Sequence, residues 1–222
     1  MRSIVTAGRR RVEMYTSADV TVGIVCRHPE LLPRCFDGVL AQTATPARVL
    51  VIDHDCLPAV TVDDFVLRNL RCPVDVVRLE SCNLPAETRN HALTLCRTPL
   101  LAWLDPAVVP SPDWLELMVD AIVPRCHCLA RRAEKVVGVG GKTDYLNRGG
   151  AHAVPPRNYG ERALDDAPCL WSGNAIYKVA ALQAVGGYPA VPAGEEDAAL
   201  GARLRQEGQV MLYVPGIVAA EL

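Results

Sequence analysis

The chain has 222 residues, enough for one large α/β domain or two small ones, and half of them are hydrophobic, which supplies a core without disulfides. A net charge of −2 lacks the basic excess that a general nucleic-acid binder would carry. Nine cysteines, an odd number lying mostly in apolar runs, indicate reduced thiols, and we expect no signal peptide and no membrane span, hence a cytoplasmic protein, free or peripheral to the membrane.

The first half of the chain alternates buried strands with helices. Residues 1–18 are polar and basic, and are predicted to form an N-terminal arm or an extra edge strand. Apolar runs predict strands at 20–26, 48–53, 74–79 and 100–104. Helical spacing, proline starts and capping signals predict helices at 30–42, 61–70, 85–96 and 113–123. This alternation indicates a mostly parallel sheet flanked by helices, with right-handed crossovers.

The second half has a different texture. A strand is predicted over 135–139, and Gly138-x-Gly140-Gly141 is interpreted as the turn that ends it, because its spacing fits no phosphate-binding pattern. Residues 147–166, rich in Gly, Pro and charge, are expected to form an active-site loop or to stay unstructured. The remaining predicted elements are helices at 179–185 and 195–207 and a strand at 210–214. We therefore expect an arm over 1–18 and a single α/β domain over 19–222.

Asp105 is the first candidate functional residue. It ends the apolar run Leu100-Leu101-Ala102-Trp103-Leu104, and a turn and a helix start near Asp113 follow it. A buried strand of this kind delivers the aspartate to its C-terminal end, the edge of an open α/β sheet where ligands bind. The sequence therefore predicts a ligand site at this edge.

Four further segments carry motifs of one known family in the same order. They are the strand 20–26 with Pro29-Glu30-Leu31-Leu32 and Ala41-Gln42-Thr43, the strand ending in Asp53, the run 83–93 containing Thr88-Arg89-Asn90, and a C-terminal group with Ser172-Gly173-Asn174, Gly186-Gly187-Tyr188, Glu195-Glu196-Asp197 and Tyr213-Val214-Pro215. With the Asp105 segment they cover about 20–215 and resemble family-two glycosyltransferases of the GT-A fold. The resemblance implies a GT-A-like, Rossmann-like domain with a nucleotide-binding half over 19–123 and an acceptor-binding half over 124–222.

The resemblance implies that the first half binds a nucleoside-diphosphate sugar through Val25, Arg27, Asp53, Arg89 and Asp105. A carboxylate at Asp53 would accept hydrogen bonds from the base, and the guanidinium of Arg89 would bind the diphosphate. The residues alone leave other interpretations open. Asp53 could instead cap a strand-end turn, and Arg89 could be a surface helix arginine.

Asp105 matches the first aspartate of the family's Asp-x-Asp motif, which holds a divalent cation, but Ala107 replaces the second aspartate. The resemblance implies Mn²⁺ or Mg²⁺ as cofactor, and phosphate oxygens can complete the shell around one carboxylate. Glu221 lies near the place where some members have a further ligand. The sequence leaves a metal-dependent and a metal-free mechanism open.

In the second half, Asp197 matches the family's catalytic base, with Glu196 as the alternative. The acceptor would lie on Trp171, Gly173 and Asn174. Acidic residues also suit a first helical turn for dipole reasons, and Trp171 could simply fill the core.

The implied function is an inverting glycosyltransferase that moves a single sugar from a nucleoside-diphosphate sugar to a hydroxyl of a saccharide, small molecule or lipid. Single transfer is expected because the family's processive Gln-x-x-Arg-Trp signature is absent. The main alternative is a catalytically impaired binding or partner module, because Arg27, His54 and Ala107 depart from the family pattern. A nucleotidyltransferase is the lesser alternative, since no Gly-rich phosphate loop follows the first strand.

Overall fold

The computed structural model describes residues 4–7, 10–61, 63, 71–80, 84–123, 134–145 and 159–221. The helix predicted over 61–70 and most of the loop predicted over 147–166 lie outside the described residues. No helix in the described ranges is long and apolar enough to cross a membrane.

Within these ranges, eight strands form one mixed sheet in the order β5-β4-β3-β6-β9-β8-β10-β7. The strands are β3 (Val20–Cys26), β4 (Arg48–His54), β5 (Val74–Leu79), β6 (Leu100–Leu104), β7 (Val108–Pro110), β8 (Val136–Tyr145), β9 (Asn174–Lys178) and β10 (Val210–Glu221). β3 pairs in parallel with both β4 and β6, and β4 pairs in parallel with β5. β9 runs antiparallel between β6 and β8 and so joins the two halves of the chain into one sheet.

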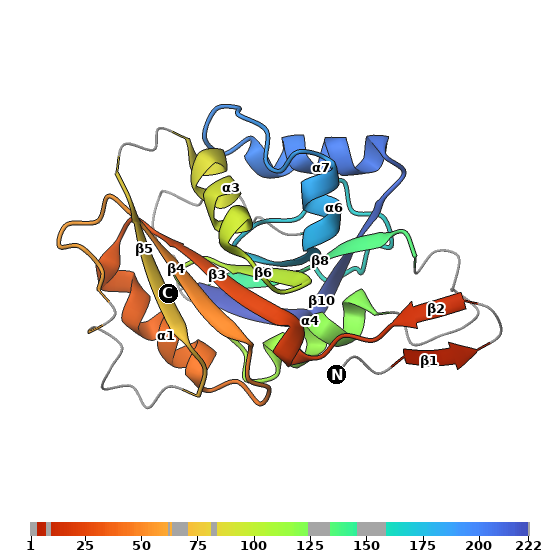
Figure 1. The fold of residues 1–222 in the computed structure, drawn as a ribbon, viewed down its shortest axis with the longest axis horizontal. Coiled ribbons are helices and arrows are strands. Elements are labelled where there is room, and N and C mark those ends of the chain that lie inside the picture. Colours follow the sequence, from red (N-terminus) through yellow and green to blue (C-terminus); the bar gives the residue numbers. More distant parts are fainter. Residues whose placement is uncertain are drawn as a thin grey trace.

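Helices cover both faces of this sheet (Figure 1). The helices α1 (Leu32–Leu40) and α4 (Trp114–Ile122) lie on one face, and α3 (Pro85–Leu95), α6 (Val179–Ala184) and α7 (Glu196–Gln206) lie on the other. Two short 3₁₀ turns, η1 (Ser17–Asp19) and η2 (Pro29–Leu31), precede β3 and α1. The sheet is therefore buried on both sides, which explains why its parallel strands read as continuous apolar runs.

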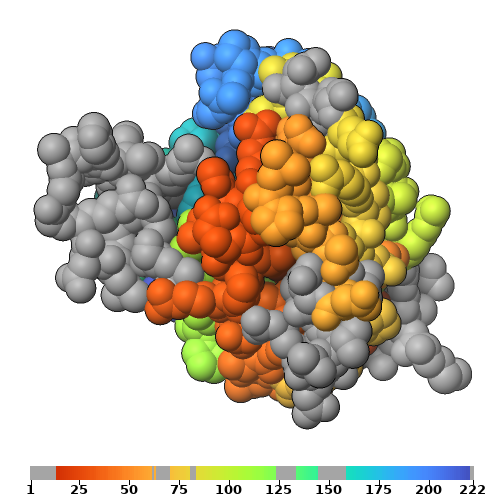
Figure 2. All heavy atoms as spheres, turned by 90° about the vertical axis from the view of Figure 1, so that its left-hand side faces the viewer, coloured from red at the N-terminus to blue at the C-terminus, as the bar shows by residue number. Residues whose placement is uncertain are grey.

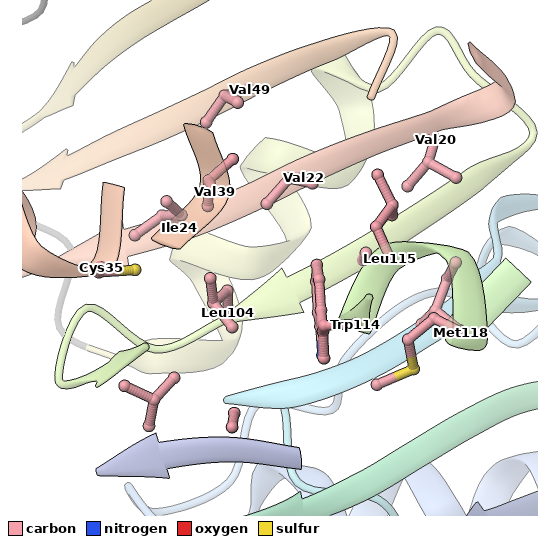
Figure 3. Close-up of a cluster of buried hydrophobic side chains, with 14 of the residues drawn as sticks. Val20, Val22, Ile24, Cys35, Val39, Val49, Leu104, Trp114, Leu115 and Met118 are labelled. Carbon is pink, nitrogen blue, oxygen red and sulfur yellow. The ribbon is translucent and has the colours of Figure 1, made fainter. Parts of the chain in front are cut away.

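The alternation of side chains along a strand divides the core into two clusters. In β4, Val49 and Val51 join the cluster under α1 and α4, whereas Leu50 and Ile52 join the cluster under α3, α6 and α7. Figure 3 shows the first cluster, in which Trp114 of α4 lies among strand residues.

The four strands and three of the helices predicted in the first half are confirmed. The ends of the strands, of α3 and of α4 differ from the predicted ends by a few residues at most. The predicted first helix is divided into η2 and a shorter α1, which ends at Leu40. The 1–18 arm is not an edge strand of the main sheet. Its described part forms a separate hairpin of β1 (Ile4–Ala7) and β2 (Arg10–Glu13).

The prediction that Gly140-Gly141 ends a strand is wrong, because β8 continues through both glycines to Tyr145. The glycines are there because their neighbours lie very close. A Cβ on Gly140 would approach the Leu170 side chain to 2.8 Å, and one on Gly141 would approach the Ile217 carbonyl oxygen to 2.1 Å. Strands β7 and β9 were not predicted, and β10 continues beyond its predicted end at Val214 to Glu221.

Candidate active site

A cleft of about 350 Å³ opens at the sheet edge where β3, β4 and β6 end. Its lining contains Val25, Arg27, Arg89, Asp105 and Glu196 from the predicted site. The other lining residues were not predicted to contact a ligand: His28, Leu31, His54, Pro85, Trp103, Leu104, Pro106, Ala107, Ser172, Ala193 and Gly194. Figure 2 looks onto this side of the molecule, with red and orange residues from the ends of β3 and β4 near its centre and blue residues from before α7 at the top.

The topology accounts for this position. β3, β4 and β6 are parallel neighbours, so their carboxyl ends and the segments that follow them meet at one edge. In open α/β sheets this edge is the usual ligand site. Of the three residues predicted to share one cleft, Asp53, Arg89 and Asp105, the geometry places Arg89 and Asp105 in the lining; Arg89 comes from α3, and Asp105 directly follows β6.

Asp105 lies in a tight turn that its own groups stabilise. The Asp105 N–H donates to the Gly173 carbonyl (3.1 Å), the Val108 N–H donates to the Asp105 carbonyl (3.1 Å), and Asp105 Oδ1 accepts the Ala107 N–H (2.8 Å). One carboxylate oxygen is thus already bound to the backbone, and Ala107 contributes no ligand atom.

These residues do not make a metal-binding set by themselves. A search of the described residues finds no cluster of three or more His, Cys, Asp or Glu side chains suited to a metal ion. The backbone of Glu221 pairs with that of Val108, which brings the end of β10 close to the Asp105 turn, but the Glu221 side chain is outside the description. Of the two metal ligands predicted from the sequence, Asp105 is therefore the one whose side chain the structure describes.

Arg89 and Glu196 form an ion pair at the cleft. Arg89 Nη1 lies 2.9 Å from Glu196 Oε1, and both side chains are largely buried. The Gly194 N–H donates to Glu196 Oε2 at 2.6 Å. Burial by itself would raise the pKa of Glu196, but hydrogen bonds from the backbone and the charge of Arg89 outweigh it and lower that pKa.

Asp197 has a different environment. Its carboxylate does not line the cleft and accepts hydrogen bonds from the Ser172 N–H (3.0 Å) and the Ser172 hydroxyl. The Tyr188 hydroxyl in turn lies 2.9 Å from Ser172 Oγ. Burial raises the pKa of Asp197, against the opposing charge of Arg89 and the hydrogen bonds from Ser172. The pKa of Asp197 is thus shifted upward and that of Glu196 downward, and Ser172, which lines the cleft, separates Asp197 from it.

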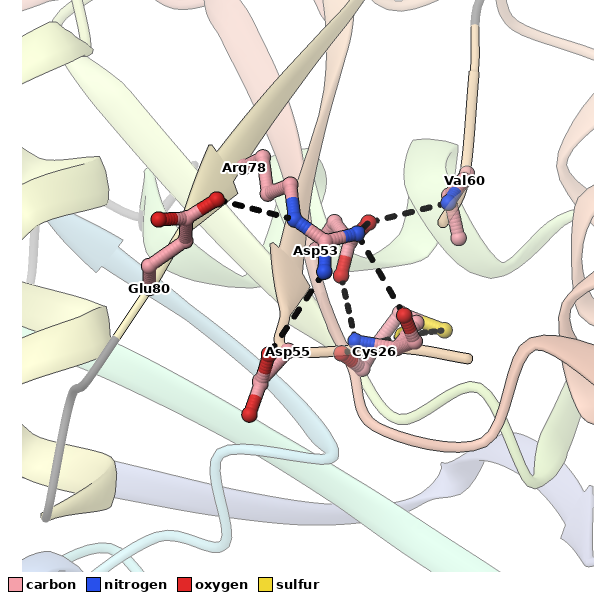
Figure 4. Close-up of polar contacts among 7 residues, drawn as sticks. Cys26, Asp53, Asp55, Val60, Arg78 and Glu80 are labelled. Atoms are coloured by element: carbon pink, nitrogen blue, oxygen red, sulfur yellow. Dashed lines mark hydrogen bonds and ion pairs between the residues drawn. The ribbon is translucent and has the colours of Figure 1, made fainter. Parts of the chain in front are cut away.

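Asp53, predicted to contact the donor base, does not line the cleft. The carboxylate is fully buried, where Oδ1 accepts the Cys56 N–H (2.7 Å) and Oδ2 accepts the Val60 N–H (2.9 Å). Arg78 Nη1 lies 3.1 Å from Oδ2, and Figure 4 shows the Arg78 guanidinium beside Asp53, Asp55 and Glu80. The geometry matches the alternative interpretation, in which Asp53 holds the turn that follows its strand.

The three residues predicted to bind the acceptor do not line the cleft either. Asn174 is buried, accepts the Trp114 indole N–H (2.7 Å) and donates to the Lys142 carbonyl (2.9 Å), so it joins β9 to α4 and β8. Trp171 packs over Gly173, where a Cβ would approach the indole ring to 2.3 Å. Ser172, which the same motif contains, is the residue of this segment that reaches the cleft.

His54 is the most informative residue that the predicted site omitted. It is buried at the end of β4, where it lines the cleft and lies 2.9 Å from both Arg27 Nη2 and Thr88 Oγ1. A signal was present in the sequence, because His54 follows Asp53 at the end of a buried strand and so belongs to the ligand edge.

Comparison with known families gives one clear match. The family model described as "Glycosyl transferase family 2" matches residues 22–186, well over half of the chain. Among curated proteins, the pre-mycofactocin glycosyltransferase of Mycobacterium tuberculosis strain H37Rv is 28% identical over 177 residues. The match covers 76% of this chain but 36% of that protein, so the chain spans about a third of its length.

Solved structures share the fold. GalNAc-T7, crystallised with UDP, GalNAc and Mn²⁺, is similar with a TM-score of 0.69 and 16% identity, covering 91% of this chain and 43% of that one. The mannosyltransferase PcManGT from Pyrobaculum calidifontis, in complex with GDP-Man and Mn²⁺, is similar with a TM-score of 0.68 and 17% identity. The match covers 96% of this chain and 60% of that one. S. aureus TarS 1–349 has a TM-score of 0.65 and 17% identity, and the match covers 91% of this chain and 60% of that one. These likenesses establish a GT-A-like fold.

Proposed function

This chain belongs to glycosyl transferase family 2, and we propose that it transfers a single sugar from a nucleoside-diphosphate sugar to an acceptor hydroxyl, inverting the anomeric carbon. The observation that carries the proposal is that Arg89 and Asp105 line one cleft at the carboxyl edge of the sheet. Glu196, the first residue of α7, lines the same cleft. The acceptor is a saccharide, a small molecule or a lipid.

The proposed reaction is a direct displacement. The acceptor oxygen attacks the anomeric carbon while the bond from that carbon to the diphosphate oxygen breaks, and the electron pair leaves with the diphosphate. A guanidinium such as that of Arg89 stabilises the developing negative charge through its N–H donors. No step of this mechanism is routed through a metal ion, because the described residues contain no cluster of three or more side chains suited to one and Ala107 leaves Asp105 as a single carboxylate at the Asp-x-Asp position.

We assign the general base to Asp197, with Glu196 as the alternative. A base must take the acceptor proton as the new bond forms, and a raised pKa favours that step. Burial raises the pKa of Asp197, whereas hydrogen bonds from the backbone and the charge of Arg89 lower that of Glu196. Against this stands the position of Glu196, which lines the cleft where Asp197 does not.

The test is a thermal-shift screen of UDP-, GDP- and dTDP-sugars, followed by calorimetry on any that binds. One nucleotide class is expected to raise the melting temperature by several degrees at saturating concentration. Product analysis with and without acceptor candidates then measures transfer and hydrolysis. If no nucleotide or nucleotide sugar binds, the proposal is wrong.

A second candidate is a non-catalytic binding module with the same fold. It is favoured by one set of observations: Ala107 removes a carboxylate, while Glu196 and Asp197 are both engaged by neighbouring groups. Nucleotide binding without transfer or hydrolysis would support this module over the enzyme.

A further inference from the structure

The cleft lacks one carboxylate of the Asp-x-Asp pattern, at Ala107, and it contains a guanidinium, that of Arg27, whose charge no carboxylate among the described residues offsets. At the Asp-x-Asp position Ala107 leaves Asp105 alone, with Oδ1 bound to the backbone. Arg27, at the end of β3, lines the same cleft and is exposed. In the part of the chain that the structure describes, no carboxylate makes an ion pair with Arg27.

The guanidinium of Arg27 is held against His54. Arg27 Nη2 lies 2.9 Å from His54 Nε2, and Arg27 Nε lies 3.4 Å from Nδ1. A guanidinium can only donate, so at this contact the nearer ring nitrogen, Nε2, is the acceptor. The cation at this place is therefore Arg27, and His54 fixes its position without neutralising it.

Contacts with Thr88 and burial at the end of β4 fix the position of His54. Thr88 Oγ1, fully buried on α3, lies 2.9 Å from His54 Nδ1, and His54 itself is buried. Each ring nitrogen of His54 therefore has a polar neighbour. An arginine seated in this way loses less conformational entropy when it binds an anion than a freely rotating one would.

The second arginine of the cleft cannot supply the same free charge. Arg89 is paired with Glu196 at 2.9 Å and packs over the Tyr188 ring, with its guanidinium carbon 5.6 Å from the ring centroid. Burial would lower the pKa of Arg89, but the charges of Asp197 and Glu196 raise it instead, which keeps it protonated and compensated. The described cleft thus has one arginine whose charge is available to an incoming diphosphate.

Resting on the proposed function, we propose that Arg27, positioned by His54, binds the donor diphosphate in place of a divalent cation, so that nucleotide binding by this chain does not require a metal. A guanidinium binds phosphate oxygens through two parallel hydrogen bonds and brings a fixed positive charge. It stabilises both the bound donor and the diphosphate that leaves.

Calorimetry on UDP, GDP and dTDP tests this proposal, with the chelator EDTA in one series and Mn²⁺ in the other. For the nucleotide that binds, we expect dissociation constants that agree within about threefold in the two series. Arg27→Met keeps the length of the side chain and removes the charge, and should weaken binding about 10- to 100-fold in both series. Arg27→Lys should recover part of the loss, because it restores charge without the planar fork.

Arg97→Met is the matched control, because Arg97 is also exposed but precedes β6 at the end of the sheet opposite the cleft. It should leave the dissociation constant unchanged. Binding that needs Mn²⁺, or that Arg27→Met does not weaken, overturns the inference while leaving the proposed function standing. Failure of all three nucleotides to bind with and without Mn²⁺ overturns both.

Discussion

Arg89 Nη1 and Glu196 Oε1, 2.9 Å apart, join α3 of the first half of the chain to α7 of the second half. Both residues line the cleft, so this ion pair links the proposed donor side to the proposed acceptor side. A buried ion pair offsets the cost of taking two charges out of water only while both partners are present. Removing one partner should therefore affect the fold as well as the site.

A double-mutant cycle measures this coupling. Arg89→Met and Glu196→Gln should each lower the free energy of unfolding by about 3 kcal/mol, because each leaves the other group buried without its partner. The double variant should lose clearly less than the sum of the two. Urea denaturation gives the values, and a sum that is simply additive would show that the pair contributes nothing to stability. The exposed pair Arg205–Asp166 is the control, with an expected coupling of about 0.5 kcal/mol or less.

Asp53→Asn tests whether that residue holds a turn or contacts the nucleotide. The new amide would direct N–H groups at the Cys56 or Val60 N–H, so we expect a loss of about 2 kcal/mol in the free energy of unfolding. Asp55→Asn is the matched control, because Asp55 is exposed and asparagine tolerates its positive φ of 57°. It should change stability by less than about 0.5 kcal/mol. Unchanged stability with lost nucleotide binding in Asp53→Asn would favour the direct contact predicted from the sequence.

The sequence predicted the parallel half of the fold well because apolar runs buried on both faces leave a strong signal. It missed β9, whose residues follow a tight turn at Trp171-Ser172-Gly173 with no run of apolar residues long enough to stand out. The length of β8 was missed because glycine weakens a strand interior, whereas at Gly140 and Gly141 close neighbours leave no room for a side chain. Such proximity depends on packing between distant segments and is not visible in the local sequence.

Motif residues predicted a ligand site at the carboxyl edge of the sheet but did not reveal their individual tasks. Gln42 is buried and links the Gly38 and Ser111 carbonyls to the Leu115 N–H, so it joins α1 to α4. Asn90 exchanges two hydrogen bonds with the backbone of Tyr188. A family pattern marks structural amides and ligand-binding groups alike, because a chain needs both to keep the same cleft.

Gly141→Ala tests the close approach of β8 to β10. The added Cβ would lie 2.1 Å from the Ile217 carbonyl oxygen, a backbone atom that cannot turn aside. Strand separation is therefore expected, with a loss of about 3 kcal/mol or more in the free energy of unfolding. Gly216→Ala is the matched control on β10, where the Cβ meets no atom within 4 Å. It should be neutral or stabilise by about 0.5 kcal/mol. Equal stability of the two variants would contradict the packing described here.

The pH dependence of transfer separates the two candidate bases. A base must be deprotonated to act, so activity falls as the pH drops through its pKa. Burial raises the pKa of Asp197 above its ordinary 3.8, whereas Glu196 lies below its ordinary 4.5. With Asp197 as the base, kcat/KM should begin to fall at a pH above the ordinary aspartate value. Asp197→Asn should lower the rate about 10²- to 10⁴-fold and leave nucleotide affinity unchanged.

Glu196→Gln is the comparison for this assignment. It should weaken stability through Arg89, as above, yet keep the acidic limb of the pH profile, because the titrating carboxylate is still present. If Glu196→Gln abolishes transfer and Asp197→Asn retains it, the base is Glu196. If both variants retain transfer, neither carboxylate is the base, and the two residues serve only as acidic residues in the first turn of α7.

Ala107→Asp tests what the missing carboxylate does. Ala107 lines the cleft beside Asp105, so the substitution restores the Asp-x-Asp pattern at a place that ligands can reach. Without metal, the added negative charge should weaken binding of a nucleoside diphosphate by roughly tenfold through repulsion of its phosphates. With Mn²⁺, two carboxylates and the phosphate oxygens can share the cation, and affinity should recover or exceed that of the natural chain. Calorimetry with EDTA and with Mn²⁺ gives both values.

Ala107→Asn adds similar bulk without charge, and should show neither the loss nor the strong response to Mn²⁺. An Ala107→Asp variant that binds equally well in both series would show that position 107 does not control the use of metal.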